Sequence, residues 1–336
     1  MTTGRLGQGV PSSGSQDGGR GAPPNAAYAG QLVQFPDPVR AGRHPRGVAV
    51  DASGFPVFGP YARAAVEIEE PPAGFGVDEL RLTDYVSANA AMSAAGHALW
   101  DTLGPVATPH GWTWHHVAGG RRLELVPVEV KALLRHHGGL ATAAVDHGRR
   151  GTRPLRETRP AHFALPKSLV SVTEQQVVAV EEELGYRLPG AYRSFLKAAG
   201  GCAPVGVALD AELGLLVDQP FFTVRDSADI NDLVYVNKCL RDHLTKDFLG
   251  VAFVQGGLLA VKVRGEGLGS VWFCAYDDVR DRDGLSVQER VRDLLFPCGE
   301  DFDVFLARLA GNPPELETVA NLMVDGGFAY AVPVEE

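Results

Sequence analysis

The chain has 336 residues, of which 45% are hydrophobic, and a formal net charge of −10. That length predicts about two domains, and the hydrophobic content argues against a chain that is disordered throughout. The sequence contains no run of about 18 apolar residues, so we expect no membrane-spanning helix.

Cysteine usage and the N-terminal sequence both bear on the compartment. The four cysteines lie far apart and form no Cys-x-x-Cys pair. The first ten residues lack the apolar core of a secretory signal peptide. We therefore expect a cytoplasmic protein with free thiols, rather than disulfides or a cysteine zinc site.

Charge and histidine are divided unequally along the chain. Residues 1–166 contain 16 basic and 14 acidic residues, whereas residues 167–336 contain 15 and 27. Nine of the ten histidines lie in the first of these parts. We expect metal or proton chemistry there, and an acidic body poorly suited to approach nucleic acid in the other.

Composition divides the chain into five segments. Glycine, proline and serine dominate the start, and a basic stretch rich in glycine and proline lies near the middle. The expected order is a flexible tail at 1–30, a first domain at 31–145, a basic linker at 146–166, a second domain at 167–310, and a C-terminal tail at 311–336 with a helix-sized segment.

Mixed structure is expected from about Leu32, and the first domain is predicted to contain a helix and a hairpin. The helix is predicted at 84–92 with Thr83 as its N-cap. Residues 112–117 and 122–126 alternate large and polar side chains around an Ala-Gly-Gly turn. That alternation is typical of two paired strands.

The hairpin leads into a second predicted helix. Pro127 suits the first turn of a helix that runs to about His137, where two glycines end it. His115 and His116 are adjacent on the first strand and so face opposite ways. One could hold a divalent ion with His136 or His137, while the other activates water for phosphodiester hydrolysis. The spacing leaves open the alternative that these are surface or structural histidines.

Four ordered blocks carry a resemblance to a known family. They are Gly-Phe-Pro-Val-Phe-Gly-Pro-Tyr-Ala at 54–62, Asp-Tyr-Val-Ser-Ala-Asn at 84–89, Thr-Pro-His-Gly-Trp-Thr-Trp-His-His at 108–116, and Leu-Glu-Leu-Val-Pro at 123–127 followed by His-His-Gly-Gly at 136–139. With these blocks, the stretch from 44 to 140 resembles the Trp-His-His toxin nucleases of the HNH/endonuclease VII-like superfamily. The resemblance implies a ββα-metal core that cuts DNA or RNA.

The resemblance also implies roles for individual residues. His115 and His116 would be the catalytic pair, with His115 as a metal ligand and His116 as the general base. His136 would be a further metal ligand from the helix, and Trp114 would be structural. The implied cofactor is a divalent ion, magnesium or zinc, and the implied substrate is nucleic acid.

Three positions depart from that family's pattern. Lys131 stands where a second helix histidine is usual, and a protonated lysine cannot bind a cation. Val57 replaces an acidic residue, and His137 replaces a threonine. Either His137 restores a metal ligand, or the site is degenerate. Lys131 and Arg135 are spaced to share one helix face and could contact phosphates, although a solvated face is an equal alternative.

The second domain is expected to contain two helices, several strands and a further helix. A Thr-Glu-Gln-Gln capping box at 173–176 opens the first helix, which Gly185 ends, and Pro189 opens the second. The later elements are strands at 248–254, 258–264 and 270–276, and a helix at 302–309. The fold class of the whole chain is therefore α+β. For the aspartates at 277, 278, 281 and 283 we favour a charged loop over calcium binding.

A second resemblance comes from the motif Leu-Gly-Tyr-Arg-Leu-Pro-Gly-Ala-Tyr-Arg-Ser-Phe-Leu-Lys-Ala-Ala-Gly-Gly at 184–201. With the preceding helix and the later strands, residues 167–310 resemble the SUKH superfamily of Smi/Knr-like immunity proteins. The resemblance implies a domain that binds and neutralises nuclease toxins and is not an enzyme. The capped helix pair, the expected hairpin at residues 256–257 and the absence of any catalytic constellation predict that it also folds independently. Its acidic charge suits a basic nuclease partner.

Two functional hypotheses of different classes follow. One is a metal-dependent nuclease domain fused to its own neutralising domain. The other is an immunity or binding protein whose nuclease-like half is degenerate and inactive. A plain scaffolding role for the second domain is a third possibility. The expected partners are nucleic acid for the first domain and a nuclease toxin for the second, and no membrane.

Overall fold

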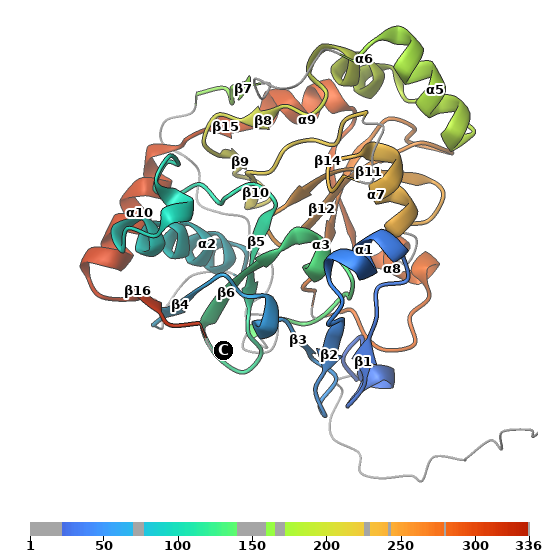
Figure 1. The fold of residues 1–336 in the computed structure, drawn as a ribbon. Coiled ribbons are helices and arrows are strands. Elements are labelled where there is room, and N and C mark those ends of the chain that lie inside the picture. Colours follow the sequence, from blue (N-terminus) through green and yellow to red (C-terminus); the bar gives the residue numbers. More distant parts are fainter. Residues whose placement is uncertain are drawn as a thin grey trace, which may run out of the picture.

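The computed structural model describes residues 22–69, 77–139, 159–164, 172–224, 229–240, 243–278 and 280–334. The fold is α+β, as expected, and every pairing between named strands in these ranges is antiparallel (Figure 1). Within them, no helix is long and apolar enough to cross a membrane.

The N-terminal half, residues 22–139, is built on a four-stranded sheet with the strand order β16-β4-β6-β5. The predicted hairpin is confirmed as β5 (Trp112–His116) and β6 (Arg122–Pro127). Strand β4 (Ala64–Ile68) pairs with β6 on the other side.

The expectation of a C-terminal tail at 311–336 is wrong. Helix α10 (Pro314–Asp325) packs against α2, and β16 (Ala329–Val332) pairs with β4 (Figure 1). The end of the chain thus completes the sheet of the N-terminal half. Leu316, Ala320 and Met323 of α10 are buried in the same hydrophobic core as Trp114.

Helix α2 (Val77–Ala94) is longer than the helix predicted at 84–92. Thr83, expected as its N-cap, lies inside it and is buried. The side chains from Leu80 to Met92 are all buried, because the helix is covered on several sides. A helix buried in this way lacks the apolar stripe by which a sequence reveals its length.

Helix α3 (Val128–Lys131) is much shorter than predicted. The backbone N–H of His136 donates a hydrogen bond to the carbonyl oxygen of Tyr276, 3.1 Å away, instead of to a carbonyl within a helix. His136 and His137 therefore lie on an irregular segment and not on a helix, contrary to expectation.

Small elements accompany the sheet, and those that precede β4 pack on the end of β6 and on α3. Residues 1–21 of the expected flexible tail lie outside the described residues. From residue 22 the chain is packed: Asn25 is buried and donates a hydrogen bond to the carbonyl oxygen of Arg135. The small elements are η1 (Ala26–Tyr28), β1 (Leu32–Val33), α1 (Pro38–Arg43), β2 (Val48–Val50), β3 (Pro56–Val57), η2 (Gly59–Tyr61) and η3 (Ala98–Trp100).

The C-terminal half, residues 172–311, centres on a sheet ordered β11-β12-β13-β14. The predicted capping box at Thr173 is confirmed, and Gly185 ends that helix with a φ of 75°, a conformation that favours glycine. The strands are β11 (Phe248–Val254), β12 (Gly257–Lys262), β13 (Val271–Ala275) and β14 (Leu295–Gly299). The helices are α5 (Glu174–Leu184), α6 (Gly190–Ala199), α7 (Leu233–Cys239), α8 (Val287–Leu294) and α9 (Phe302–Arg308).

The two halves share hydrophobic cores. Val128 and Ala132 belong to the core of the C-terminal half, and Leu209 and Leu216 to that of the N-terminal half. Of the expected linker at 146–166, residues 159–164 are described, and they pack on the C-terminal half. Within the described linker residues, β7 (Phe163–Ala164) pairs with β8 (Ala203–Pro204) of the C-terminal half. The other strands of the C-terminal half are β9 (Ala208–Asp210), β10 (Leu215–Val217) and β15 (Ala310–Gly311).

Candidate functional site

Three aromatic rings meet on one face of strand β5. The ring of His115 lies 4.9 Å from that of His136 and 4.8 Å from that of Phe58, between centroids. Phe58 also contacts His136, at 5.2 Å. The exposed fractions are 4% for His115 and 1% for each of the others, so solvent hardly reaches the two imidazoles, and Phe58 covers part of each.

The two imidazoles have the electronic state that a metal ligand needs. His136 Nδ1 donates to the carbonyl oxygen of Leu134, which leaves a lone pair on Nε2. Neither this Nε2 nor His115 Nδ1 has a hydrogen-bond partner among the described residues. Burial lowers the pKa of His136 to about 4, and it also lowers that of His115, with a contribution from His136. Both side chains are therefore neutral at pH 7.

Lys131 opposes metal binding at this pair. It is 4% exposed, and its Nζ donates to the carbonyl oxygen of Trp114 at 2.6 Å. Burial is the largest cause of the lowered pKa values of His115 and His136, and the positive charge of Lys131 lowers both further. At His136, Lys131 is the largest cause after burial. Burial lowers the pKa of Lys131 itself to about 8, so most of the amine stays protonated at pH 7.

His137 does not restore a third ligand. Its Nε2 donates to the carbonyl oxygen of Asp281, 2.6 Å away in the C-terminal half. Across the described ranges, no group of three or more His, Cys, Asp or Glu side chains could hold a metal ion. Two imidazoles beside an ammonium do not fit a divalent ion.

His116 lies on the opposite face of β5, as strand alternation predicts. Its Nε2 is 3.0 Å from Oδ2 of Asp84, and its ring is 5.3 Å from that of Tyr85, both on α2. Arg121 donates to the other oxygen of Asp84 at 2.5 Å. Burial lowers the pKa of His116, and the hydrogen bond to Asp84 opposes this shift. His116 is thus oriented by a carboxylate but faces away from the pair of His115 and His136.

Lys131 and Arg135 do not form a phosphate-contacting surface. Both are buried, because α3 packs on the C-terminal half. Arg135 donates to Oδ2 of Asp281 at 2.7 Å, to the carbonyl oxygen of Ala275 at 3.1 Å and to Sγ of Cys274 at 3.0 Å. Both alternatives, phosphate contacts and a solvated face, required a longer helix with these two side chains exposed, whereas α3 ends at Lys131 and both side chains are buried.

The sequence assigned no role to Asp84 or Asp277, two carboxylates of the site. For Asn89, in the same block as Asp84, it left open a role in orienting the site or in a helix cap or turn. Asn89 accepts a hydrogen bond from Trp114 Nε1 at 2.8 Å. Trp114 is fully buried, in keeping with its implied structural role. Asp277 was expected in a charged loop, yet its Oδ1 accepts a hydrogen bond from Gly138 N at 2.7 Å. The four aspartates between residues 277 and 283, just after β13, were the one sequence feature that could have indicated a role for Asp277.

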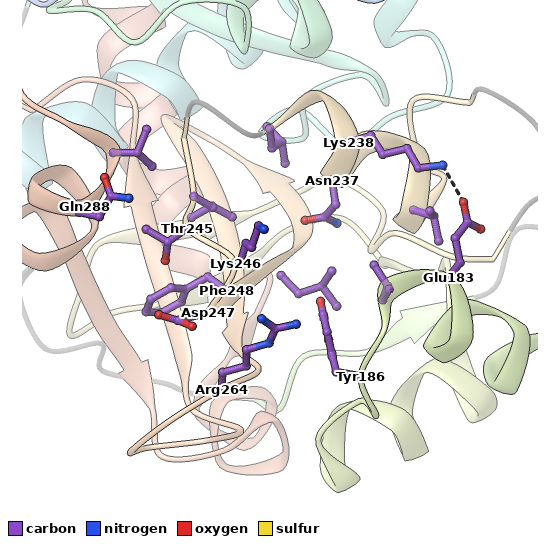
Figure 2. A pocket seen from close by; sticks show the side chains of 16 residues that line it. Glu183, Tyr186, Asn237, Lys238, Thr245, Lys246, Asp247, Phe248, Arg264 and Gln288 are labelled. Atoms are coloured by element: carbon purple, nitrogen blue, oxygen red, sulfur yellow. Dashed lines mark hydrogen bonds and ion pairs between the residues drawn. The ribbon is translucent and has the colours of Figure 1, made fainter.

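A separate pocket of about 910 Å³ lies in the C-terminal half, beside α7 and the start of β11 (Figure 2). Tyr186 and Arg264 line one side, and an ion pair between Lys238 and Glu183 spans 2.6 Å at its rim. Among the described residues, its lining contains no histidine or cysteine and none of the residues around the imidazoles of β5. It therefore contributes nothing to the chemistry considered above.

Two family models match separate parts of the chain. Residues 104–146 match the model of WHH, described as a nuclease of the HNH/ENDO VII superfamily with conserved WHH, and residues 171–308 match the SMI1/KNR4 family (SUKH-1). The chain joins a WHH domain to a SUKH-1 domain. No curated protein matches it. The order of the two matches confirms both resemblances, and we call residues 22–139 the WHH half and residues 172–311 the SUKH half.

The WHH match raises the question of a metal. Nucleases of the HNH/ENDO VII superfamily generally use a divalent metal ion. In this WHH half, the conserved Trp-His-His is present as Trp114, His115 and His116. The residues around His115 nevertheless do not fit such an ion, because Lys131 brings a positive charge and supplies no lone pair.

Proposed function

We propose that this protein is an immunity-type binding protein whose WHH half does not cleave nucleic acid in its present form. A WHH nuclease domain followed by a SUKH domain supports a fusion of the toxin–immunity kind. The observation that carries the proposal is Lys131, whose buried ammonium group adjoins the two imidazoles that would hold the metal.

Charge and geometry both oppose catalysis. A divalent ion near a buried ammonium group is repelled strongly, because the interior screens charge far less than water does. Phe58 covers the imidazole pair, so a phosphodiester has no path to it in this conformation. His116 faces α2, where Asp84 binds it, so it cannot reach a water molecule held by the pair.

We assign toxin binding to the SUKH half, as the resemblance of residues 167–310 to SUKH immunity proteins suggested. SUKH domains are immunity proteins that bind toxins. An excess of acidic residues in 167–336 favours association with the basic surface of a nuclease. The four cysteines are free, which suits action in the reducing cytoplasm.

One observation favours a second candidate function, a metal-dependent nuclease activity of the WHH half. His115 Nδ1 and His136 Nε2 are buried, neutral and without a partner among the described residues, as ligands awaiting a metal would be. An unpaired buried polar atom costs stability, so its retention calls for a reason. If Lys131 moved out and Phe58 opened, two of the three ligands of a catalytic site would be in place.

A nuclease assay on the full-length chain separates the two candidates. Wild type, His115→Ala, Lys131→His and the double variant Lys131→His/His136→Ala are incubated with duplex DNA or structured RNA and with magnesium, manganese, cobalt or zinc. We expect no cleavage by wild type. Metal-dependent cleavage by wild type that His115→Ala abolishes would contradict the proposal and establish the nuclease.

A further inference from the structure

One carboxylate of the SUKH half is inserted into the WHH half. Asp277 follows β13, and its side chain is buried. Its Oδ1 accepts a hydrogen bond from the backbone N–H of Gly138 at 2.7 Å. Gly138 immediately follows His137 and lies at the end of the WHH segment that began with the hairpin.

The contact requires glycine at this position. A Cβ atom on Gly138 would lie 2.6 Å from Oδ2 of Asp277 and 3.1 Å from the carbonyl oxygen of His116. Both oxygens of the carboxylate therefore lie directly against the glycine backbone. Any other residue would displace Asp277, since such close Cβ contacts do not occur.

Two basic side chains, Arg81 and Lys131, lie near Asp277. Arg81 is buried, and its Nη2 donates to the backbone carbonyl of Asp277 at 2.9 Å. The negative charge of Asp277 acts to raise the pKa values of Lys131, His116 and His136, against the larger effect of burial. A backbone N–H, a guanidinium and a buried amine form a set of groups that favours an anion.

Neighbouring contacts keep Asp277 in this place. The carbonyl oxygen of Tyr276 accepts from the backbone N–H of His136 at 3.1 Å. Asp281 forms a buried ion pair with Arg135 at 2.7 Å. Residues on both sides of Asp277 thus bind the same short WHH segment, so the carboxylate is held rather than free to leave.

We propose that Asp277 occupies a phosphate-binding site of the WHH half, so that the SUKH half blocks that site within the same chain. Backbone N–H groups and arginine are also the groups that bind nucleic-acid phosphates, and a carboxylate offers the same acceptor oxygens. The idea deepens the proposed function by naming a partner of the SUKH half, which is the WHH half of its own chain. It does not depend on whether the WHH half cleaves.

Inorganic phosphate is the probe. Full-length wild type, Asp277→Ala and Asp277→Asn are melted in about 20 mM phosphate and in chloride of the same pH and ionic strength. The control is Asp293→Ala, which removes an exposed aspartate paired with Arg292. Phosphate should raise the Tm of Asp277→Ala by about 2–4 °C more than that of the control. Wild type and Asp277→Asn should behave like the control, because their side chains still fill the site.

An equal phosphate effect on Asp277→Ala and Asp293→Ala overturns the proposal. If Asp277→Ala yields no folded protein in chloride, recovery of folded protein in phosphate supports the site, and failure in both buffers counts against it. The nuclease assay above is independent of this result. If Asp277→Ala binds phosphate and wild type does not cleave nucleic acid, the phosphate site and the proposed function are both supported. If wild type cleaves nucleic acid, only the proposed function is contradicted.

Discussion

Lys131 donates a hydrogen bond from Nζ to the backbone carbonyl of Trp114, 2.6 Å away, one residue before His115. The bond fixes the amine beneath the strand that carries the Trp-His-His motif. It also satisfies one proton of a buried ammonium group, which would otherwise lose all of its hydration. The motif and the residue that opposes its usual chemistry are therefore joined directly.

Replacing Lys131 with histidine should create a metal site. Lys131→His exchanges the repelling ammonium for a third imidazole near His115 and His136. We expect the variant to bind Co²⁺ with the visible absorption of a tetrahedral site, and wild type to show none. Lys131→Met is the matched control, since it removes the charge without adding a ligand. An identical spectrum for Lys131→His and Lys131→Met would disprove the assignment of the ligands.

The stability of the protein should depend on Lys131 at alkaline pH. Burial lowers the pKa of this amine from 10.5 to about 8, so between those values the unfolded chain binds more protons than the folded one. The contribution of Lys131 to the free energy of unfolding therefore rises with pH, by about 3 kcal/mol over the full interval. Urea unfolding at several pH values, with Lys131→Met as the reference, measures it. If the free energy of unfolding varied with pH in the same way for wild type and Lys131→Met, Lys131 would not be a buried charged group.

Buried histidines should make the protein sensitive to acid. Burial lowers the pKa of His243 to about 3 and that of His136 to about 4, below the ordinary value of 6.5. The stability that each contributes is present above pH 6.5 and is lost as the pH falls towards those lower values. His243 Nε2 donates to the carbonyl oxygen of Ala132, so His243→Gln keeps a donor and removes the titration. This variant should lose less stability than wild type between pH 6.5 and 5, as measured by chemical unfolding.

The C-terminal helix should be essential to the WHH half. Met323 is buried against α2, whereas Leu322, its neighbour on α10, is 66% exposed. We expect Met323→Ala to lower the free energy of unfolding by about 2–4 kcal/mol and Leu322→Ala to leave it nearly unchanged. Chemical denaturation of the two variants makes the comparison. Equal effects would mean that α10 does not belong to this core.

The buried ion pair between Arg135 and Asp281 should stabilise the contact between the halves. Arg135→Ala leaves a buried carboxylate with Arg290 as its remaining ion-pair partner among the described residues. We expect a loss of about 3–5 kcal/mol, the usual effect of breaking a buried pair. The exposed pair of Arg292 and Asp293 provides the control, because Arg292→Ala should cost less than about 1 kcal/mol.

Much of the local structure could be predicted because its causes are local. Side-chain alternation indicated the hairpin of β5 and β6 and placed His115 and His116 on opposite faces. The reciprocal hydrogen bonds of Thr173 and Gln176 opened α5 as expected. Such features depend on residues a few positions apart, so a single sequence contains all the information they need.

The predictions that were wrong concern contacts between residues far apart along the chain. The end of α3 depends on Tyr276, whose carbonyl oxygen captures the N–H of His136. The place of β16 depends on β4, more than 250 residues earlier, and no local pattern marks that pairing.

The sequence by itself determined the two families, the α+β class and the unusual presence of Lys131 beside a Trp-His-His motif. Only the tertiary structure decided that Phe58 covers part of the histidine pair, that Arg135 is buried, and that Asp277 lies against Gly138. The physical reason is that burial and charge pairing are set by all the segments that meet at a point. For Arg135 and Asp277 those segments come from both halves of the chain, so their meeting cannot be read from either half alone.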